Sequence, residues 1–168
     1  MRGDLGEQRL DLLRLGLGHD EGGVGGVHDH EVVHAEQGDE VFALAKDRSV
    51  VPHGHNNMAT AFLILKGQMR GRHYQRHADE PKHLILSSTM DKEFGPGGAA
   101  TISDVKDNIH WFEALSDSAF IFNIHVVGVT PGKKGAGRVY VDPNGEKIEG
   151  GKIRARIIEE DEADQLYG

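Results

Sequence analysis

The segment HGHNNMATAFLILKG, residues 53–67, decides the fold. Two histidines, His53 and His55, are separated by one residue and come just before the apolar run ATAFLIL. In an extended chain, residues two apart point to the same face, so both imidazoles can converge on one point. Lys66 and Gly67 then end the run with a turn signal. The segment therefore predicts a buried strand with a pair of imidazoles at its entrance.

Short apolar runs separated by turn residues continue on both sides of this segment. They are EVFALA (40–45), VVPHGH (50–55), ATAFLIL (59–65), QMRGRHYQ (68–75), HLILSST (83–89), AATISDV (99–105), NIHWFEAL (108–115), SAFIFNIHVVGV (118–129), GRVYVD (137–142) and KIRARII (152–158). Many short strands at this spacing are typical of an all-β sandwich or barrel rather than a βαβ fold.

The two ends of the chain differ from the middle in residue composition and in the pattern of apolar residues. The start is leucine-rich and favours a loose amphipathic helix, and a stretch rich in glycine and histidine follows it without a sustained period. We expect residues 1–38 to be a partly flexible N-terminal extension, residues 39–160 the barrel and residues 161–168 a C-terminal tail. The acidic end favours a short helix or tail.

Composition excludes several classes of function. A formal net charge of -8 argues against a nucleic-acid partner, because a surface that binds the phosphate backbone needs a basic excess. No run approaches the ~20 apolar residues that cross a bilayer, and the N-terminus lacks the apolar core of a signal peptide. We therefore expect a cytoplasmic protein without a membrane partner. Because the chain has no cysteine, histidine, aspartate or glutamate must supply any metal ligands.

A third metal ligand has to come from outside the HxH pair. His110 is the best candidate, because it lies in another strand-like run as a polar residue between Ile109 and Trp111. Neutral imidazole is the usual nitrogen ligand for iron, zinc, copper or nickel. We predict that His53, His55 and His110 hold one divalent metal. The alternative for the HxH pair is a solvated pair on the surface.

A second histidine array competes with this set. His28, His30 and His34 form an HxHxxxH pattern with Glu36 close by. Its surroundings are rich in glycine and no predicted strand carries it, so no scaffold would hold three ligands rigidly. Adventitious metal binding is the most that this array predicts.

The segment 53–67 resembles the first cupin motif, in which HxH is followed by a glutamate and then a glycine at fixed spacing. Gly67 stands at the expected place, whereas the glutamate position holds Thr60. The HxHxxM pattern with Met58, and DNIHWFEA at 107–114, are similar to the motifs of three-histidine thiol dioxygenases of the cysteamine dioxygenase and plant cysteine oxidase type. The resemblance implies an all-β cupin double-stranded β-helix with a glycine-rich N-terminal extension.

The same resemblance implies a function. It points to a non-haem Fe(II) dioxygenase whose partners are O2 and a small thiol or related small molecule, with nickel, manganese and zinc as alternative metals. Three imidazoles on one side of a metal leave adjacent positions open for substrate and O2. GRVYVDPNGE at 137–146 is similar to a Gly-Arg…Tyr segment of that group, which implies that Tyr140 lies near the pocket as a catalytic residue.

Strand parity suggests further site residues. Arg70, Arg72 and Tyr74 alternate along one run, and an arginine there can clamp a substrate carboxylate, so we predict a substrate-binding role for all three. The alternative is that these arginines face solvent. His73 lies beside a polar loop and is predicted at the surface. His125 lies in an apolar run and is predicted to be a hydrogen-bonded core or interface histidine.

Other readings of the sequence stay open. A cupin that only binds a small molecule, as a sensor or storage module, is one alternative to an enzyme. A cupin isomerase that uses a histidine–acid pair as base is another, and it requires a carboxylate that faces the histidines. The apolar run 118–129 also suits pairing of two copies in a homodimer.

Overall fold

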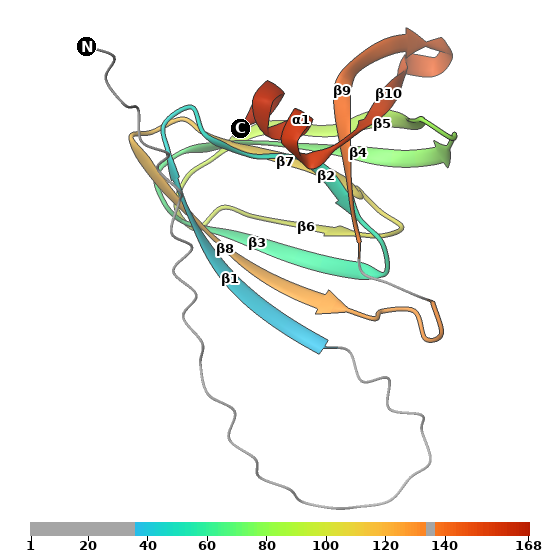
Figure 1. Cartoon of the computed structure of the whole chain (residues 1–168). Helices are drawn as coiled ribbons and strands as arrows, with labels where there is room; N and C mark the ends of the chain where they lie inside the picture. The colour runs from blue at the N-terminus through green and yellow to red at the C-terminus, as the bar shows by residue number, and fades with distance from the viewer. Residues whose placement is uncertain (1–35, 134–136) are drawn as a thin grey trace, which may run out of the picture.

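The computed structural model describes residues 36–133 and 137–168 (Figure 1). The predicted N-terminal helix, most of the glycine-rich stretch and the array around His28 lie outside the described residues. In the described part of the chain, no helix is long and apolar enough to cross a membrane.

Strands dominate the described part of the chain, and their pairings are antiparallel. They are β1 (Glu36–Ala45), β2 (Ser49–His55), β3 (Met58–Lys66), β4 (Met69–Asp79), β5 (His83–Phe94), β6 (Ala99–Ser103), β7 (Ile109–Ala114), β8 (Ser118–Val127), β9 (Arg138–Ile148) and β10 (Lys152–Ile158). A short 3-10 turn, Glu149–Gly151, links the last two strands, and α1 (Glu160–Tyr167) ends the chain.

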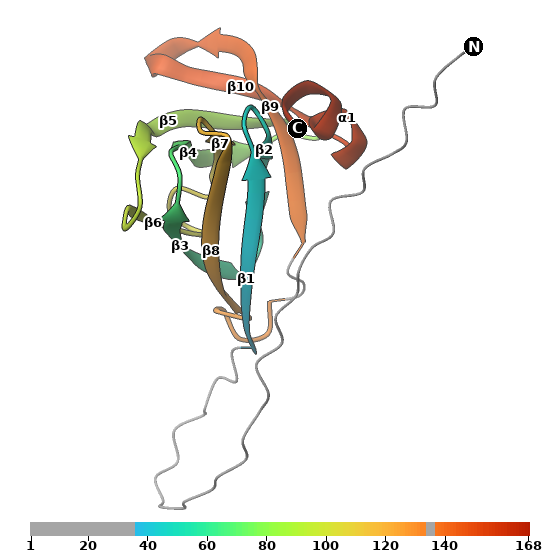
Figure 2. The same cartoon turned by 90° about the vertical axis from the view of Figure 1, so that its left-hand side faces the viewer.

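The strands form two sheets that face each other (Figures 1 and 2). Sheet A has the order β1-β8-β3-β6. Sheet B has the order β10-β5-β4-β7-β2-β9 and closes on itself, because β10 pairs with both β5 and β9. Two facing antiparallel sheets with strands that alternate between them are the jelly-roll arrangement of the cupin double-stranded β-helix. The predicted fold class is therefore confirmed.

Alternation along the strands explains why the sheets pack on each other. In β3, Phe62 and Ile64 are buried while Leu63 and Leu65 between them are exposed. Since successive side chains of a strand point to opposite faces, one face of sheet A turns inward. It meets inward-facing residues of sheet B in one apolar core that includes Met69 and Phe112. A second core fills the closed sheet; its buried members are Tyr74, Leu84, Leu86, Ile109, Val141 and Ala155.

The C-terminal helix closes one side of the molecule. Ala163 of α1 is buried against Val51 of β2 and Ile158 of β10. Three acidic residues, from Glu160 to Glu162, occupy its first turn, where the helix dipole favours negative charge. The helix thereby brings carboxylates to the side of the barrel where β2 and β9 pair.

Candidate metal centre

The strand register brings the predicted ligands together. His53 of β2 stands opposite His110 of β7 on one side and opposite Tyr140 of β9 on the other. His110 in turn stands opposite His73 of β4. Directly opposed residues of neighbouring strands project from the same face of the sheet. His55 is two residues beyond His53 and shares that face, so four histidines and a tyrosine project from the inner face of sheet B.

Three of these histidines converge at metal-ligand distances. The Nε2 atoms of His53 and His55 lie 3.1 Å apart, and one ring nitrogen from each of His53, His55 and His110 lies within 4.8 Å of the others. Two nitrogens bound at about 2.1 Å and at right angles to each other would be about 3.0 Å apart. All three side chains are buried. The donor set therefore fits a single divalent ion of the kind that imidazole binds.

Backbone carbonyls orient two of the imidazoles. The Nδ1 atom of His53 lies 2.8 Å from the carbonyl oxygen of Val51, and the Nδ1 atom of His110 lies 3.4 Å from that of Asn108. A neutral ring that donates its Nδ1–H to a carbonyl presents the lone pair of Nε2 to the metal. The Asn108 amide also donates to the backbone carbonyl of His55 at 2.6 Å, which ties β2 to β7 at the site.

Burial keeps the imidazoles neutral. Desolvation is the main reason that the pKa of His53 falls to about 4 and that of His55 to about 3, and the nearby Arg138 cation adds to both effects. Desolvation also holds the pKa of His110 well below its usual value. At neutral pH all three rings therefore carry the lone pair that a metal needs.

A hydroxyl occupies the position where the first cupin motif has its glutamate. Thr60 is buried, and its Oγ1 lies 2.9 Å from Nδ1 of His125 on the neighbouring strand β8. The His125 ring centroid is 6.1 Å from that of His55. Sheet A thus presents a threonine-bound imidazole to the cluster, and no carboxylate comes from β3 at this point.

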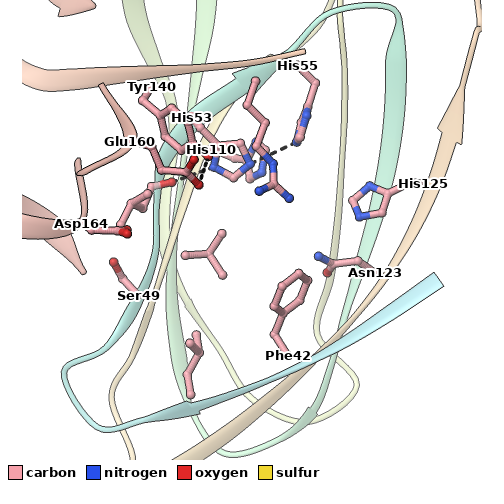
Figure 3. A pocket seen from close by; sticks show the side chains of 14 residues that line it. Phe42, Ser49, His53, His55, His110, Asn123, His125, Tyr140, Glu160 and Asp164 are labelled. Atoms are coloured by element: carbon pink, nitrogen blue, oxygen red, sulfur yellow. Dashed lines mark hydrogen bonds between the residues drawn. The ribbon is translucent and has the colours of Figure 1, made fainter. Parts of the chain in front are cut away.

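A cavity of about 270 Å³ adjoins the cluster (Figure 3). One wall is apolar and includes Phe42 and Val50. The polar groups on its other walls come from four strands and from α1; they are Ser49, His53, His55, His110, Asn123, His125, Arg138, Tyr140, Glu160 and Asp164. The metal-binding edges of the imidazoles thus face a space of small-molecule size.

Tyr140 lines this cavity beside the cluster. Its ring centroid is 5.8 Å from that of His53, and its hydroxyl donates a hydrogen bond to Glu160 at 2.5 Å. Burial and the Glu160 carboxylate raise the pKa of Tyr140, so the phenol keeps its proton at neutral pH. The position suits the predicted role near the pocket, and the catalytic role itself stays a prediction.

The structure does not bring Arg70, Arg72 and Tyr74 to this cavity. Arg70 makes a bidentate pair with Asp91, with nitrogen–oxygen distances of 2.7 and 2.8 Å. Arg72 donates to Glu113 and lies over the Trp111 ring, with its guanidinium carbon 3.9 Å from the ring centroid. Tyr74 is buried in the second core. The inward positions of β4 beside the cluster are Met69, Gly71 and His73, which explains why the two arginines face outward.

His73 is buried, so its predicted surface position is wrong. It is 2% exposed, and its Nε2 has no hydrogen-bond partner within the described residues. Desolvation lowers the pKa of His73 to about 4. Its neighbours are the rings of Phe62 and Phe112, so it lies one strand beyond the three-histidine cluster and on the same face. The prediction for His125 is supported: it is half-buried and hydrogen-bonded to Thr60.

Sequence reasoning missed three charged residues of the cavity. Glu160 and Asp164 lie one helical turn apart on α1, and no sequence pattern links that helix to the histidines. Arg138 did have a signal: it stands two residues before Tyr140 on β9, so the two share a face of the strand.

Comparisons with known proteins concern the fold alone. No protein-family model matches the sequence, and no curated protein matches it. Procruciferin, an 11S globulin from Brassica napus, is 11% identical and superposes with a TM-score of 0.46. The match covers 61% of this chain and 22% of the procruciferin chain. An uncharacterised Klebsiella pneumoniae protein with a double-stranded β-helix domain is 14% identical, with a TM-score of 0.42 over 61% of this chain and 73% of its own. RmlC from Streptococcus suis, solved with dTDP-D-xylose, is 12% identical, with a TM-score of 0.44 over 54% of this chain and 44% of its own. This chain thus spans less than a quarter of the globulin, and the fold assignment rests on the strand order.

Proposed function

We propose that this protein is a metal-dependent cupin that works as a non-haem Fe(II) dioxygenase on a small thiol or a related small molecule. The observation that carries the proposal is the convergence of three buried, neutral imidazoles with a threonine in place of the motif's glutamate. The reaction adds both atoms of O2 to the sulfur, so that a thiol RSH and one O2 give the sulfinic acid RSO2H. No further oxidant or reductant is required.

The charge of the site favours this substrate class. Three neutral imidazoles leave the full charge of a divalent ion uncompensated, whereas a carboxylate ligand would cancel one unit of it. A thiolate restores that balance when it binds. Iron bound to the three histidines would supply the open coordination positions for thiolate and O2.

The residues of the chain have separate tasks in this proposal. His53, His55 and His110 hold the ion, and the carbonyls of Val51 and Asn108 fix two of the rings. The Tyr140 hydroxyl keeps its proton beside Glu160 and can donate a hydrogen bond to a substrate in the cavity. The apolar wall around Phe42 limits the water that reaches the substrate.

The test is oxygen consumption with a panel of small thiols. Protein prepared without a metal-affinity column is loaded anaerobically with Fe(II), and O2 uptake is compared with the sulfinate formed, identified by mass. We expect one sulfinate per O2 with at least one thiol and no turnover in His110→Ala. Iron-loaded protein that consumes no O2 with any thiol would contradict the proposal and would favour a binding or sensor cupin.

One observation favours a second candidate, a metal-independent isomerase. Such a reaction requires a carboxylate that faces the histidines, and Glu160 lines the same cavity, where its charge acts on His53. A metal assay separates the two functions. An isomerase would keep its activity in His110→Ala and lose it in Glu160→Gln, and a dioxygenase requires His110 and iron.

A further inference from the structure

The arginines of the described strands differ in what they contact. Five of them contact carboxylates, namely Arg70, Arg72, Arg76, Arg154 and Arg156. Arg138 is an exposed residue that lines the cavity beside Tyr140, whose pKa it lowers against the larger effect of burial, and no ion pair joins it to a carboxylate within the described residues. A guanidinium presents a rigid fork of donors that matches a carboxylate in a bidentate geometry. The cavity thus contains a guanidinium that pairs with no carboxylate among the described residues.

A buried polar atom without a partner lines the same cavity. The side chain of Asn123 is 3% exposed, and its Oδ1 has no hydrogen-bond partner within the described residues. Figure 3 shows the Asn123 amide pointing into the cavity from β8, near His125. A buried amide oxygen without a partner is costly, and a ligand that donates an N–H or O–H would satisfy it.

The remaining charged groups of the cavity define the rest of the ligand. Glu160 and Asp164 line the wall formed by α1 and would repel a second anionic group, whereas they would attract an ammonium group. The cavity of about 270 Å³ corresponds to about nine water molecules at about 30 Å³ each, so the ligand is small. Arg138, Asn123 and the acidic wall therefore match one small molecule with one anionic end and hydrogen-bond donors.

We propose that the cavity binds a small carboxylate that also carries a hydrogen-bond donor, with its carboxylate on Arg138 and its donor on the Asn123 amide. This inference rests on the proposed function for the identity of the thiol, and it stands on its own as a statement about anion binding. It gives Arg138 and Asn123 the substrate-positioning role that sequence parity assigned to Arg70 and Arg72.

Anaerobic titration calorimetry tests the inference without relying on turnover. The probes are 3-mercaptopropionate and its neutral counterpart 3-mercaptopropan-1-ol, with metal-free and Fe(II)-loaded protein. We expect the carboxylate to bind at least about tenfold more tightly, because a charge-assisted bond has about that effect on affinity. Arg138→Gln should remove this preference, and Arg138→Lys should restore part of it. Arg48→Gln, an exposed arginine outside the cavity, is the control and should change nothing.

The Asn123 half of the site needs a separate comparison. Cysteine carries an ammonium donor that 3-mercaptopropionate lacks, so cysteine should bind more tightly to the natural chain. Asn123→Leu, which has the same branched shape, should reduce that advantage, while the attraction of the ammonium to Glu160 and Asp164 and the preference for the carboxylate stay. A thermal melt checks that this buried substitution leaves the chain folded.

The outcomes separate this inference from the proposed function. Equal affinity for the charged and neutral thiols, or a preference that survives in Arg138→Gln, overturns the inference even if both thiols consume O2. If the preference for the carboxylate depends on Arg138 but the protein consumes no O2, the result supports this inference and contradicts the proposed dioxygenase function.

A different observation, the outer face of sheet A, carries a second inference. Most outward positions of its strands are apolar; they are Val41, Ala43, Ala45, Ala59, Ala61, Leu63, Leu65, Ala99, Phe120, Phe122, Ile124 and Val126. The same register also gives polar or charged outward positions, which are Gln37, Asp39, Thr101, Ser103 and Ser118. Lys66 stands opposite Phe120, with its ammonium over that ring. Three of the apolar residues are among the exposed large hydrophobic residues: Leu63, Leu65 and Ile124. An apolar area of this extent is unusual on a chain of net charge -8.

We infer that this outer face binds a second copy of the chain. Four strands spaced about 4.8 Å apart and paired over about eight residues of about 3.4 Å give a face of roughly 500 Å². Two such faces would bury about 1,000 Å² in total, the lower bound for a specific interface. Two copies of a strongly acidic chain repel each other, so a largely apolar face that carries few charges is where they can meet at a low electrostatic cost.

Sedimentation of the full chain tests the dimer. The natural chain should be a dimer at micromolar concentration, and Ile124→Lys or Leu65→Glu should make it a monomer with an unchanged far-ultraviolet spectrum. Val105→Glu is the matched control, because Val105 is exposed outside this face, and it should leave the dimer intact. A natural chain that is monomeric, or a dimer that Ile124→Lys and Leu65→Glu both leave intact, overturns this inference.

Discussion

Thr60 and His125 stand opposite each other in the β3–β8 ladder, and the threonine hydroxyl lies 2.9 Å from Nδ1 of the imidazole. The first cupin motif has a glutamate where this chain has Thr60. The pair therefore replaces a potential metal ligand with a neutral hydrogen bond that holds an imidazole over the cavity. Two expectations follow: a bound metal would have three histidine ligands, and the hydroxyl would contribute to stability rather than to metal binding.

Thr60→Val should test that division. The variant loses the hydroxyl and keeps the shape of the side chain, so the free energy of unfolding should fall by about 1 kcal/mol in urea titrations. Iron content should be unchanged. Thr101→Val is the control, because Thr101 is exposed in the same sheet, and its effect should be smaller. Loss of iron in Thr60→Val would show that the hydroxyl supports the metal centre directly.

Gly54 should not tolerate a side chain, although its own conformation is ordinary. A Cβ at this position would lie 2.4 Å from Oδ1 of Asn108 and 2.5 Å from Cδ1 of Ile109. Because Asn108 ties β2 to β7 at the site, Gly54→Ala should displace both strands and cost about 1–3 kcal/mol, as overpacked positions do. Iron affinity should fall as well. Gly137→Ala, with no atom within 4 Å of the added Cβ, should be neutral in both measurements.

Metal-free protein should lose stability as the pH falls through the range below 6.5. The pKa of His53 is about 4 in the fold against 6.5 for an ordinary histidine, because burial disfavours the charged ring. Below pH 6.5 the His53 ring is protonated in the unfolded chain but stays neutral in the folded chain. The contribution of the neutral ring to the free energy of unfolding is therefore complete above pH 6.5 and is lost as the pH falls towards 4. Between pH 7.5 and pH 5 the loss for this group is about 2 kcal/mol. Urea titrations at both pH values should show a smaller decrease in His53→Gln, and an equal decrease would contradict the assignment.

His73 should be dispensable for the metal. Its buried Nε2 has no partner within the described residues, so replacement by leucine removes an uncompensated polar atom. We expect His73→Leu to raise the free energy of unfolding by about 1 kcal/mol and to leave iron content unchanged. Loss of iron without loss of stability would instead make His73 a fourth ligand, from the strand next to that of His110.

The fold and the three converging histidines were predictable for a definite reason. Both depend on local patterns: the two-residue period brings His53 and His55 to one face, and the strand count with its turn signals predicts a barrel. His110 depended on its polarity within an apolar run. In each case the information lies within a few neighbouring residues. The resemblance to the motifs of three-histidine thiol dioxygenases then indicated that His110 belongs with His53 and His55.

The rest of the site depends on which face of each strand turns inward. The run QMRGRHYQ alternates in a way that fits either orientation, and the predicted substrate-binding role required Arg70 and Arg72 to face inward, whereas the alternative had them face solvent. In the structure, the rings of Phe94 and Phe112 pack against the backbone at Gly71, which turns that residue and His73 inward. Glu160 and Asp164 reach the cavity because Ala163 packs on Val51, a contact between residues more than a hundred positions apart. Long-range packing of this kind leaves no local trace in the sequence.

The measurement that tests the central claim most directly is the iron content of three proteins after anaerobic loading with Fe(II) and removal of excess metal. The natural chain should retain about one iron per chain, as should a variant with alanine at His28, His30 and His34. His53→Ala/His110→Ala should retain almost none, with a circular dichroism spectrum that shows an intact β-fold. A natural chain that retains less than about a tenth of an equivalent, or a double variant that binds iron as the natural chain does, would contradict the three-histidine centre.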